Sequence, residues 1–306
     1  MTYKIYELLR EKPLSGDEIG KNTGISRAAV NKHIKKLKDS GVKILSKTGV
    51  GYQWIEDGIN AYSLKYELIK KGMDIDVVFK PTRSTNNDAK QLALSSDKDI
   101  IVAAPYQLKG KGRLDREFVS ERGGAYFTLV VNSCKLPVAE IMRTVLVTGL
   151  AAADAIKSVN IDAKLKWPND VFVAGKKVAG ILMELIASGE RAEKLIIGIG
   201  INVYNQIPAS LKKTAARLAD YSEGKIVIPE LIARIAQNIY DYLDILKGGG
   251  WQELKQRYIA ECISLGRRVK YDGYQGEGAD ITNEGFLVIK GDNEQRIIVS
   301  GDVDIC

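Results

Sequence analysis

The spacing of apolar residues divides the chain into three stretches with different periodicities. Near the N-terminus apolar side chains recur every three or four positions, as in Val30, Ile34 and Leu37, which is the period of a helix. Between about residues 76 and 262, runs typical of strands alternate with amphipathic helical stretches. From Leu265 onward, short alternating strands are separated by Gly-containing turns, which is typical of a small β-barrel. The pattern predicts an α+β protein with three domains, over residues 1–62, 63–262 and 263–306.

The first domain has the pattern of a helix-turn-helix followed by a hairpin. Gly24 stands where the turn between two helices needs a positive φ, and Ser26 is a favourable N-cap for the helix that follows. Residues 42–54 alternate around a Gly-containing tip, as a hairpin does. This order resembles the winged helix-turn-helix family, and residues 60–68 are expected to form a helical connection to the next domain.

Positive charge is concentrated in this first domain. Residues 1–54 contain 11 basic and 5 acidic side chains, whereas the other 252 residues contain 34 basic and 33 acidic ones. Such a basic module favours a polyanion as its partner, because Arg and Lys reach phosphates or guanine and Asn can bind adenine. A solvated helix or a protein-interaction domain would give the same pattern. The candidate DNA contacts are Ser26, Arg27, Asn31, Lys32, Lys35 and Lys47.

Composition excludes several classes of site. The single histidine, His33, rules out a His-rich metal centre, and the three cysteines are widely spaced without a CxxC pair, so a disulfide scaffold or a Cys-rich zinc site is not expected. The longest mostly apolar stretch, 144–156, is too short to span a bilayer, and no secretory signal precedes the first helix. We therefore expect a cytoplasmic protein with no membrane partner.

The central domain contains an unusual loop of alternating glycines and cations. Gly110, Lys111, Gly112 and Arg113 follow one another, with Arg116 close behind. Glycines let backbone amides approach a phosphate, and the cations supply charge without acid–base chemistry. The loop lacks the GxxxxGK[ST] spacing of a Walker motif. A solvated basic loop is the alternative interpretation.

Other segments of this domain are predicted as regular elements. Ser84-Thr85-Asn86 opens a helix after the strand 76–80, where a helix N-terminus favours anions, although an ordinary N-cap would look the same. Residues 164–173 read as one strand with a polar interruption that forms a hairpin with 176–184. Residues 195–203 read as a further strand with glycines two positions apart, which marks close approach of a ligand or of another backbone.

Five motifs in this order and spacing resemble the biotin–protein ligases, and with the winged helix in front the whole chain resembles the bifunctional ligases that also repress the biotin operon. The motifs are Ser84-Thr85-Asn86, the loop 110–113, Lys166-Trp-Pro-Asn-Asp170, Lys177-Val-Ala-Gly-Ile-Leu182 and Gly198-Ile-Gly-Ile-Asn202. The resemblance implies a class II synthetase-like catalytic domain and an SH3-like C-terminal domain. It also implies biotin and ATP as substrates, Mg²⁺ as cofactor, and biotin carboxyl carrier protein, operator DNA and a second copy of the chain as partners.

The resemblance also implies roles for particular residues. Lys177 and Arg113 would be catalytic, and Asn169, Asp170 and Asn202, with Gly110 and Arg116, would contact the nucleotide. It assigns no ligand to Mg²⁺. The residues implied to bind biotin are Ser84, Thr85, Asn86, Gln107, Lys111, Gly112, Arg113 and Lys177.

The loop departs from the family pattern Gly-Arg-Gly-Arg-x-Gly-Arg-x-Trp at three positions. Lys111 replaces the first Arg and loses its bidentate fork, Asp115 replaces the third Gly, and Phe118 replaces the Trp. These changes bear on affinity and loop closure more than on reaction type. Two other functions fit the pattern: a lipoate–protein ligase, and a regulator that senses biotin or its adenylate without catalysis, although the latter would be expected to lack Lys177 or Arg113.

Overall fold

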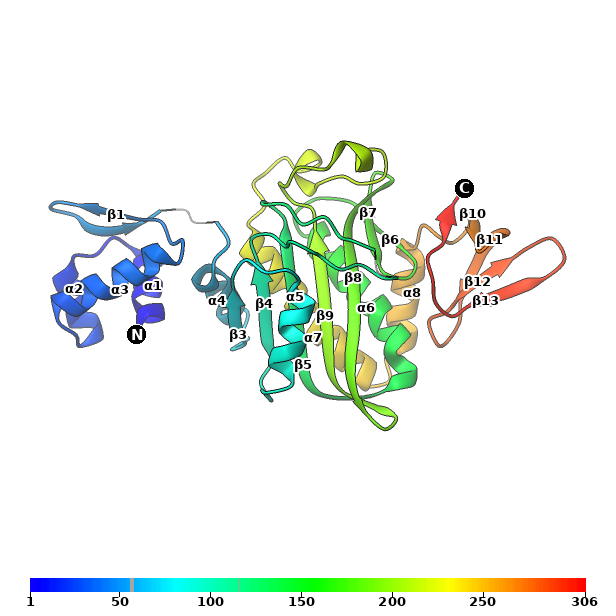
Figure 1. The fold of residues 1–306 in the computed structure, drawn as a ribbon, viewed down its shortest axis with the longest axis horizontal. Coiled ribbons are helices and arrows are strands. Elements are labelled where there is room, and N and C mark those ends of the chain that lie inside the picture. The colour runs from blue at the N-terminus through cyan, green and yellow to red at the C-terminus, as the bar shows by residue number, and fades with distance from the viewer. Residues whose placement is uncertain (56–57, 115) are drawn as a thin grey trace.

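The structure is a computed structural model that describes residues 1–55, 58–114 and 116–306, and it shows three lobes in a row (Figure 1). The N-terminal lobe confirms the predicted helix-turn-helix and hairpin. Its elements are α1 (Thr2–Glu11), α2 (Gly16–Thr23), α3 (Arg27–Asp39), β1 (Ile44–Lys47) and β2 (Gly51–Trp54).

Local signals in the sequence set the ends of these helices. Gly24 ends α2 with φ of 71°, and the Ser26 hydroxyl accepts a hydrogen bond from Ala29 N at the start of α3. The predicted stripe on α3 is buried, with Val30 and Leu37 completely covered. The opposite face of α3 is thereby left to solvent.

Helix α4 (Ala61–Lys70) contributes to two hydrophobic cores at once. Tyr62 and Tyr66 pack against the core of the N-terminal lobe, whereas Leu64 and Leu68 are fully buried in the core of the central domain. The helix begins with a capping box at Asn60. Since its two faces belong to different domains, α4 is a packed connection and not a tether, and it crosses the expected boundary between residues 62 and 63.

Arg10 joins the N-terminal lobe to α4. Its guanidinium carbon lies 4.0 Å from the ring centre of Trp54 and 4.7 Å from that of Tyr66. The same group lies 3.6 Å from the carboxylate of Glu67, whose side chain is 9% exposed. Arg10 is therefore held by two aromatic rings and a largely buried carboxylate.

A seven-stranded sheet forms the central domain, in the order β3-β4-β5-β9-β8-β7-β6. β3 and β4 are parallel and the other neighbours are antiparallel, which agrees with the α+β class. The strands are β3 (Asp76–Phe79), β4 (Ile100–Ala104), β5 (Ala125–Pro137), β6 (Ala163–Lys166), β7 (Asp170–Val173), β8 (Lys176–Ser188) and β9 (Arg191–Ile201).

Helices cover the two faces of this sheet unequally. On one face lie α6 (Ile141–Lys157), α7 (Ile228–Lys247) and α8 (Trp251–Glu261), in agreement with the helical stretches expected between about residues 76 and 262. The short α5 (Thr85–Ala93) packs on the other face. Successive residues of β4 alternate between the cores, because Ile101 belongs to the large one and Val102 to the small one beneath α5. Much of the α5 face therefore remains available for a ligand. Three 3₁₀ turns complete the domain, at Val138–Glu140, Ala209–Leu211 and Leu218–Asp220.

The expectation of a single interrupted strand over 164–173 was wrong. The segment forms two strands, β6 and β7, which pair with each other from Ala163 opposite Val173 to Lys166 opposite Asp170. The interruption at Trp167-Pro168-Asn169 is the turn of this hairpin, because proline has no N–H to contribute to a ladder. The predicted pairing of β7 with β8 is confirmed.

The C-terminal domain is an antiparallel sheet in the order β13-β12-β11-β10-β14. Its core is continuous with that of the central domain, and Trp167 Nε1 donates a hydrogen bond to Gly285 O at 3.0 Å across the junction. The two domains are thus packed together. The strands are β10 (Arg268–Tyr271), β11 (Tyr274–Ile281), β12 (Leu287–Lys290), β13 (Gln295–Ile298) and β14 (Asp304–Ile305).

We expect Arg10→Ala to destabilise the contact between α1 and α4 by about 2 kcal/mol, because it removes two cation–π contacts and leaves a largely buried carboxylate with a weaker partner. Hydrogen-exchange mass spectrometry of peptides from α1 and α4 measures this loss. Arg27→Ala is the control, since the Arg27–Asp17 pair is 72% and 67% exposed and should contribute less than about 0.5 kcal/mol. Equal protection in the two variants would contradict this role of Arg10.

Candidate active site

The floor of the candidate site is a patch of sheet without side chains. Gly180 on β8 pairs with Gly200 on β9, and Gly198 lies two positions further along β9. A Cβ on Gly198 would collide with Asn86 Oδ1, and one on Gly200 would lie 2.7 Å from the ring of Phe118. The glycines therefore let other groups lie directly on the backbone of the sheet, as the spacing along 195–203 predicted.

One wall of the site is the N-terminus of α5. Ser84 is the N-cap of this helix and is 2% exposed, yet its side chain makes no capping hydrogen bond. Thr85 N donates to Gln107 Oε1 at 2.7 Å, and Gln107 Nε2 donates to Ser120 Oγ at 2.9 Å. The ordinary N-cap interpretation of Ser84 thus loses its support, because the hydroxyl faces the cavity instead of the helix.

The Asn86 amide is fixed by groups on two strands. Thr128 Oγ1 lies 2.7 Å from Asn86 Oδ1, and Asn86 Nδ2 donates to Glu184 Oε2 at 3.1 Å. Lys90 in turn lies 3.3 Å from the other oxygen of Glu184. Glu184 and Thr128 therefore determine which way this amide presents its donor and its acceptor.

The loop over the site folds back on itself. Gly112 N donates to Arg116 O at 2.7 Å, and Phe118 N donates to Gly110 O at 2.8 Å. Gly110 is required here, because a Cβ at this position would collide with Phe118 O. This folding turns Lys111, Gly112, Arg113 and Arg116 toward a common cavity. Asp115, one of the departures from the family pattern, lies outside the described residues.

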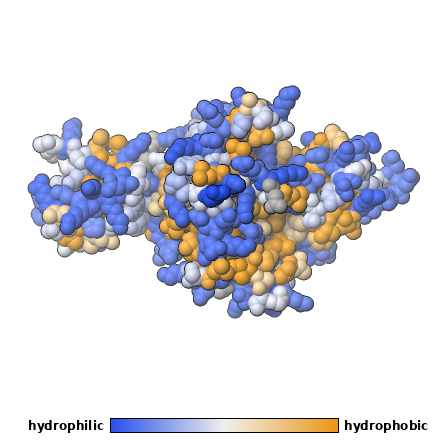
Figure 2. Space-filling model, viewed as in Figure 1, coloured by the Kyte–Doolittle hydropathy of each residue, from blue (hydrophilic) through white to orange (hydrophobic). Residues whose placement is uncertain are grey.

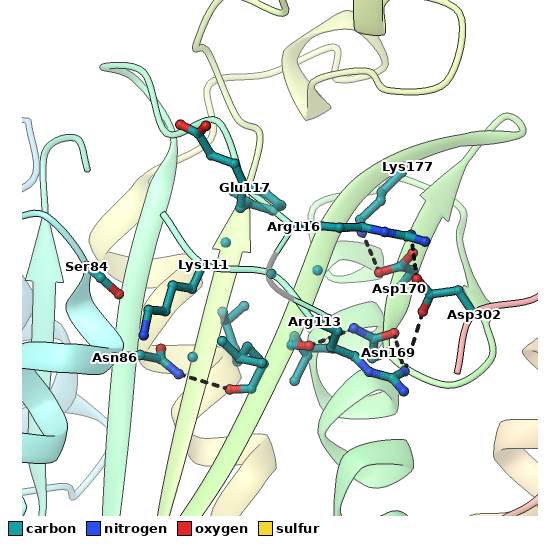
Figure 3. A pocket seen from close by; sticks show the side chains of 18 of the residues that line it. Ser84, Asn86, Lys111, Arg113, Arg116, Glu117, Asn169, Asp170, Lys177 and Asp302 are labelled. Atoms are coloured by element: carbon teal, nitrogen blue, oxygen red, sulfur yellow. Dashed lines mark hydrogen bonds and ion pairs between the residues drawn. The ribbon is translucent and has the colours of Figure 1, made fainter. Parts of the chain in front are cut away.

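Cations from the loop and from β8 gather around this cavity, and three of them lie beside a carboxylate or amide (Figure 3). Lys177 Nζ lies 2.6 Å from Asp170 Oδ1, and Arg113 Nη1 donates to Asn169 Oδ1 at 3.1 Å. Arg116 Nη1 lies 2.5 Å from Asp302 Oδ2. Figure 3 places Lys111 on the side of Ser84 and Asn86, away from these pairs. The site thus combines concentrated positive charge with a polar pocket.

The first cavity encloses about 170 Å³ and opens beside a second one of about 290 Å³. Arg116, Phe118, Asp170 and Lys177 line both cavities, and Asn202 lines the second. The Phe118 ring stands edge-on to that of Tyr126, with centres 6.4 Å apart. Burial raises the pKa of Tyr126 well above its usual value, so Tyr126 stays neutral beneath Phe118. Two adjoining cavities suit a ligand pair that meets at the shared residues.

The structure brings together nearly all the side chains that the sequence singled out for ligand binding. Gly110 begins the loop and lines neither cavity. Asn202, just past the end of β9, lines only the second cavity. Those that line the first cavity are Ser84, Thr85, Asn86, Gln107, Lys111, Gly112, Arg113, Arg116, Asn169, Asp170 and Lys177.

Several functional residues were not anticipated. Glu184 and Thr128 act on Asn86 from strands with ordinary patterns, so no local signal identifies them. Lys166 lines both cavities and was visible in the sequence as part of the Lys-Trp-Pro-Asn-Asp motif. Asp302 and Asp304 come from the C-terminal domain, which only the tertiary structure brings to the site.

The candidate DNA contacts are all exposed, and much of the N-terminal lobe is hydrophilic in the view of Figure 2. Ser26 caps α3 and Lys47 ends β1, so the helix and the hairpin contribute together. The Tyr52 hydroxyl donates to Asn31 Oδ1 at 2.6 Å, which ties the hairpin to α3. His33 lies 2.8 Å from the hydroxyl of Thr2, and no cluster of metal-ligating side chains occurs within the described residues.

The three cysteines are all free thiols. Cys134 and Cys262 are buried and Cys306 is exposed, in agreement with the expectation that no disulfide scaffold forms. Burial raises the pKa of the Cys262 thiol, so it remains protonated. Among the described helices, none is long and apolar enough to cross a bilayer.

We expect Gly198→Ala to lower the free energy of unfolding by about 1–3 kcal/mol, because the new Cβ displaces Asn86 and breaks its hydrogen bonds to Thr128 and Glu184. Scanning calorimetry measures the loss, and a crystal structure of the variant shows the movement of Asn86. Gly224→Ala is the matched control, since nothing lies within 4 Å of a Cβ there. An unmoved Asn86 in the first variant would contradict the assigned packing.

Comparison with known proteins agrees with this geometry. Residues 78–202 match the biotin/lipoate A/B protein ligase family, and residues 2–53 match an HTH domain. The bifunctional ligase/repressor BirA of Bacillus subtilis (strain 168) is 27% identical over 308 residues, covering 95% of this chain and 94% of the relative. The protein of the same name from Escherichia coli (strain K12) is 32% identical over 233 residues, covering 72% of each.

A solved structure extends the likeness to three dimensions. The biotin protein ligase from Aquifex aeolicus in complex with biotin and ATP superposes with a TM-score of 0.65 at 30% identity, covering 76% of this chain and 98% of that one. The family match over residues 78–202 includes the glycine floor and the cationic loop. The chain belongs to the biotin–protein ligase family.

Proposed function

We propose that this protein activates biotin with ATP to form biotinyl-5′-adenylate and then transfers the biotinyl group to a lysine of a biotin carboxyl carrier protein. The observation that carries the proposal is the gathering of Lys111, Arg113, Arg116 and Lys177 around two adjoining cavities with a glycine floor. The relatives named above, and the Aquifex ligase that binds biotin and ATP, support it.

The first step needs charge compensation and alignment more than acid–base catalysis. The carboxylate of biotin is already a nucleophile, and its oxygen attacks the α-phosphorus of ATP while the bond to the leaving pyrophosphate breaks. Lys177 and Arg113 offset the charge that gathers at this junction, and Arg116 lines the adjoining cavity beside it. The chain's one histidine lies in the N-terminal lobe, which is consistent with this chemistry.

The polar groups on the α5 side suit the ureido ring of biotin. Ser84, Thr85, Asn86 and Gln107 present hydroxyls and amides beside the glycine floor, where they can form hydrogen bonds with the planar ureido ring. Gly112 then covers the carboxylate end, and Lys111 lies on the α5 side of the pocket. This assignment places the ring of biotin near α5 and its carboxylate near Lys177.

The second cavity suits the nucleotide. Asn169 and Asp170 lie at the shared boundary or beside it, and Asn202 lies further in. Phe118 lines both cavities and offers an aromatic face to a base, although without the indole N–H of the family's tryptophan. Gly110 contributes indirectly, because it allows the loop to fold over the cavity.

The donor set fits Mg²⁺ that arrives on the phosphates of ATP. Mg²⁺ keeps several waters and takes one or two carboxylates together with substrate phosphates, and Asp170 offers a carboxylate at the boundary of the two cavities. When bound, the ion would neutralise phosphate charge.

In the second step the neutral amine of the carrier lysine attacks the carbonyl carbon of the adenylate. A C–N bond forms, the bond from the carbonyl carbon to the phosphate oxygen breaks, and AMP leaves, while the amine gives up a proton. The mixed anhydride is intrinsically activated, so the protein mainly shields it from water until the carrier arrives. A loop closed over the adenylate serves this purpose.

The N-terminal lobe gives the protein its second role, biotin-responsive repression. Four exposed residues of α3 suit contacts in the major groove of DNA, namely Arg27, Asn31, Lys32 and Lys35. Lys47 of the hairpin would contact the phosphate backbone of the DNA. Winged-helix repressors commonly bind two half-sites, so we propose that the adenylate-bound protein forms a homodimer on its operator.

Incubation with biotin, MgATP and a carrier domain should increase the carrier mass by one biotinyl group, measured by mass spectrometry. A carrier whose target lysine is replaced by arginine is the control and should stay unmodified. Lipoate in place of biotin should give neither carrier modification nor ATP–pyrophosphate exchange. Modification by lipoate would support the lipoate ligase, and ligand binding with no exchange would support a sensor without catalysis.

In a gel-shift titration against salt with a duplex of mixed sequence, Lys32→Ala or Lys35→Ala should weaken binding. The slope of log K against log salt should fall by about 1 for each phosphate that the variant no longer neutralises. Lys247→Ala, an exposed lysine at the end of α7, is the matched control. Addition of biotin plus ATP should tighten binding of the unaltered protein, and unchanged slopes in both α3 variants would contradict the proposed DNA surface.

A further inference from the structure

A carboxylate from the C-terminal domain forms ion pairs with two arginines of the cationic loop. Asp302 lies 2.5 Å from Arg116 Nη1 and 3.7 Å from Arg113 Nη1, so both guanidinium groups of the loop face the same side chain (Figure 3). Arg113 and Asp302 are 20% and 27% exposed. This pair is therefore partly sheltered from water, where an ion pair is screened less than at the surface.

The fold holds Asp302 at this position. Gly301 has φ of +119°, and a Cβ there would lie 2.5 Å from the ring of Tyr271. The Tyr271 hydroxyl donates to Ser300 O at 3.0 Å, and Val303 is fully buried. Asp302 thus extends from an anchored turn and is not the free end of a loose tail.

The C-terminal domain is attached to the central domain elsewhere. Trp167 Nε1 donates to Gly285 O, and Arg143 Nε donates to Asn283 O at 2.7 Å. Neither contact involves the catalytic loop. The C-terminal domain therefore has attachments that do not depend on Asp302, whereas the ion pairs of Asp302 act on the loop itself.

The two arginines cannot pair fully with Asp302 and with a phosphate at the same time. Two anions beside the same guanidinium repel each other, and the repulsion is stronger at a partly sheltered site than at an open surface, although Arg116 itself is 67% exposed. We propose that Asp302 pairs with Arg113 and Arg116 when no nucleotide is bound and is exchanged for phosphate oxygens when the nucleotide binds. The identity of the incoming anion rests on the proposed function, whereas the pairing of Asp302 with the two arginines does not.

Two consequences follow for the ligand-free and the ligand-bound protein. Without a ligand, the carboxylate orders the loop and reduces access to the peptide bonds after Arg113 and Arg116. With ATP, the carboxylate competes, so its charge weakens the apparent affinity. A carboxylate that merely positioned the arginines for phosphate would have the opposite effect on affinity.

The test compares Asp302→Asn with the unaltered protein in two measurements. Limited trypsin digestion without ligand should cut after Arg113 or Arg116 about twofold to fivefold faster in the variant, the range of a partly exposed ion pair. At saturating biotin, the KM for ATP in pyrophosphate exchange should fall by a similar factor. Asp302→Glu, which keeps the charge, should restore most of the protection from trypsin.

Asp304→Asn is the matched control. Asp304 lines the same cavity, but no ion pair to it occurs in the described part of the chain, so its loss removes a negative charge without removing an ion pair. Its trypsin rate should stay close to that of the unaltered protein. Equal rates for Asp302→Asn and Asp304→Asn would overturn the proposal, as would an ATP KM that rises or stays unchanged in Asp302→Asn.

The outcomes also separate this inference from the proposed function. If the unaltered protein exchanged no pyrophosphate with biotin present, the ligase function would fail, while the trypsin comparison would still test the pairing of Asp302 with the two arginines. If exchange occurred and the two digestion rates were equal, the ligase would stand and the exchange of Asp302 for phosphate would fall.

Discussion

Positive charge confined to a partly buried cavity is the constraint on which the rest of the site depends. Cations removed from water must be paired with anions or hydrogen-bond acceptors, because an isolated buried charge is strongly unfavourable. Asp170, Asn169 and Asp302 supply these partners to Lys177, Arg113 and Arg116 in the ligand-free chain. The carboxylate and phosphates of the proposed substrates are anions of the kind that can take over this role, so the site is complementary to them before they arrive.

The glycine floor and the cationic loop make different contributions to the site. Gly180, Gly198 and Gly200 carry no side chains, so Asn86 and the Phe118 ring can lie directly on the backbone of the sheet. The loop then covers this floor with charge. A reaction between two anions needs little more than this arrangement, which explains how a chain with one histidine, far from the site in the N-terminal lobe, can form an adenylate.

Features that depend on neighbours along the chain could be predicted from the sequence, and those that depend on tertiary contacts could not. The helical stripe of α3, the turn at Gly24 and the loop 110–113 are local, and each is where the pattern placed it. Residues 164–173 were predicted as one strand because the polar interruption within them was taken as a local break, whereas it is the tight turn of a hairpin. Asp302 is 186 positions from Arg116, and neither periodicity nor motif links the two.

The double role of α4 determines how the two proposed activities can be connected. Leu64 and Leu68 fix the helix in the central domain, while Tyr66 and Arg10 fix the N-terminal lobe to it. A helix packed against both domains fixes their relative position and restricts independent motion of either one. The proposed DNA-binding surface is therefore carried with the central domain. If the adenylate-bound protein forms the proposed homodimer, the contact between the two copies would set the spacing of their DNA-binding surfaces, with no rearrangement required inside the winged helix.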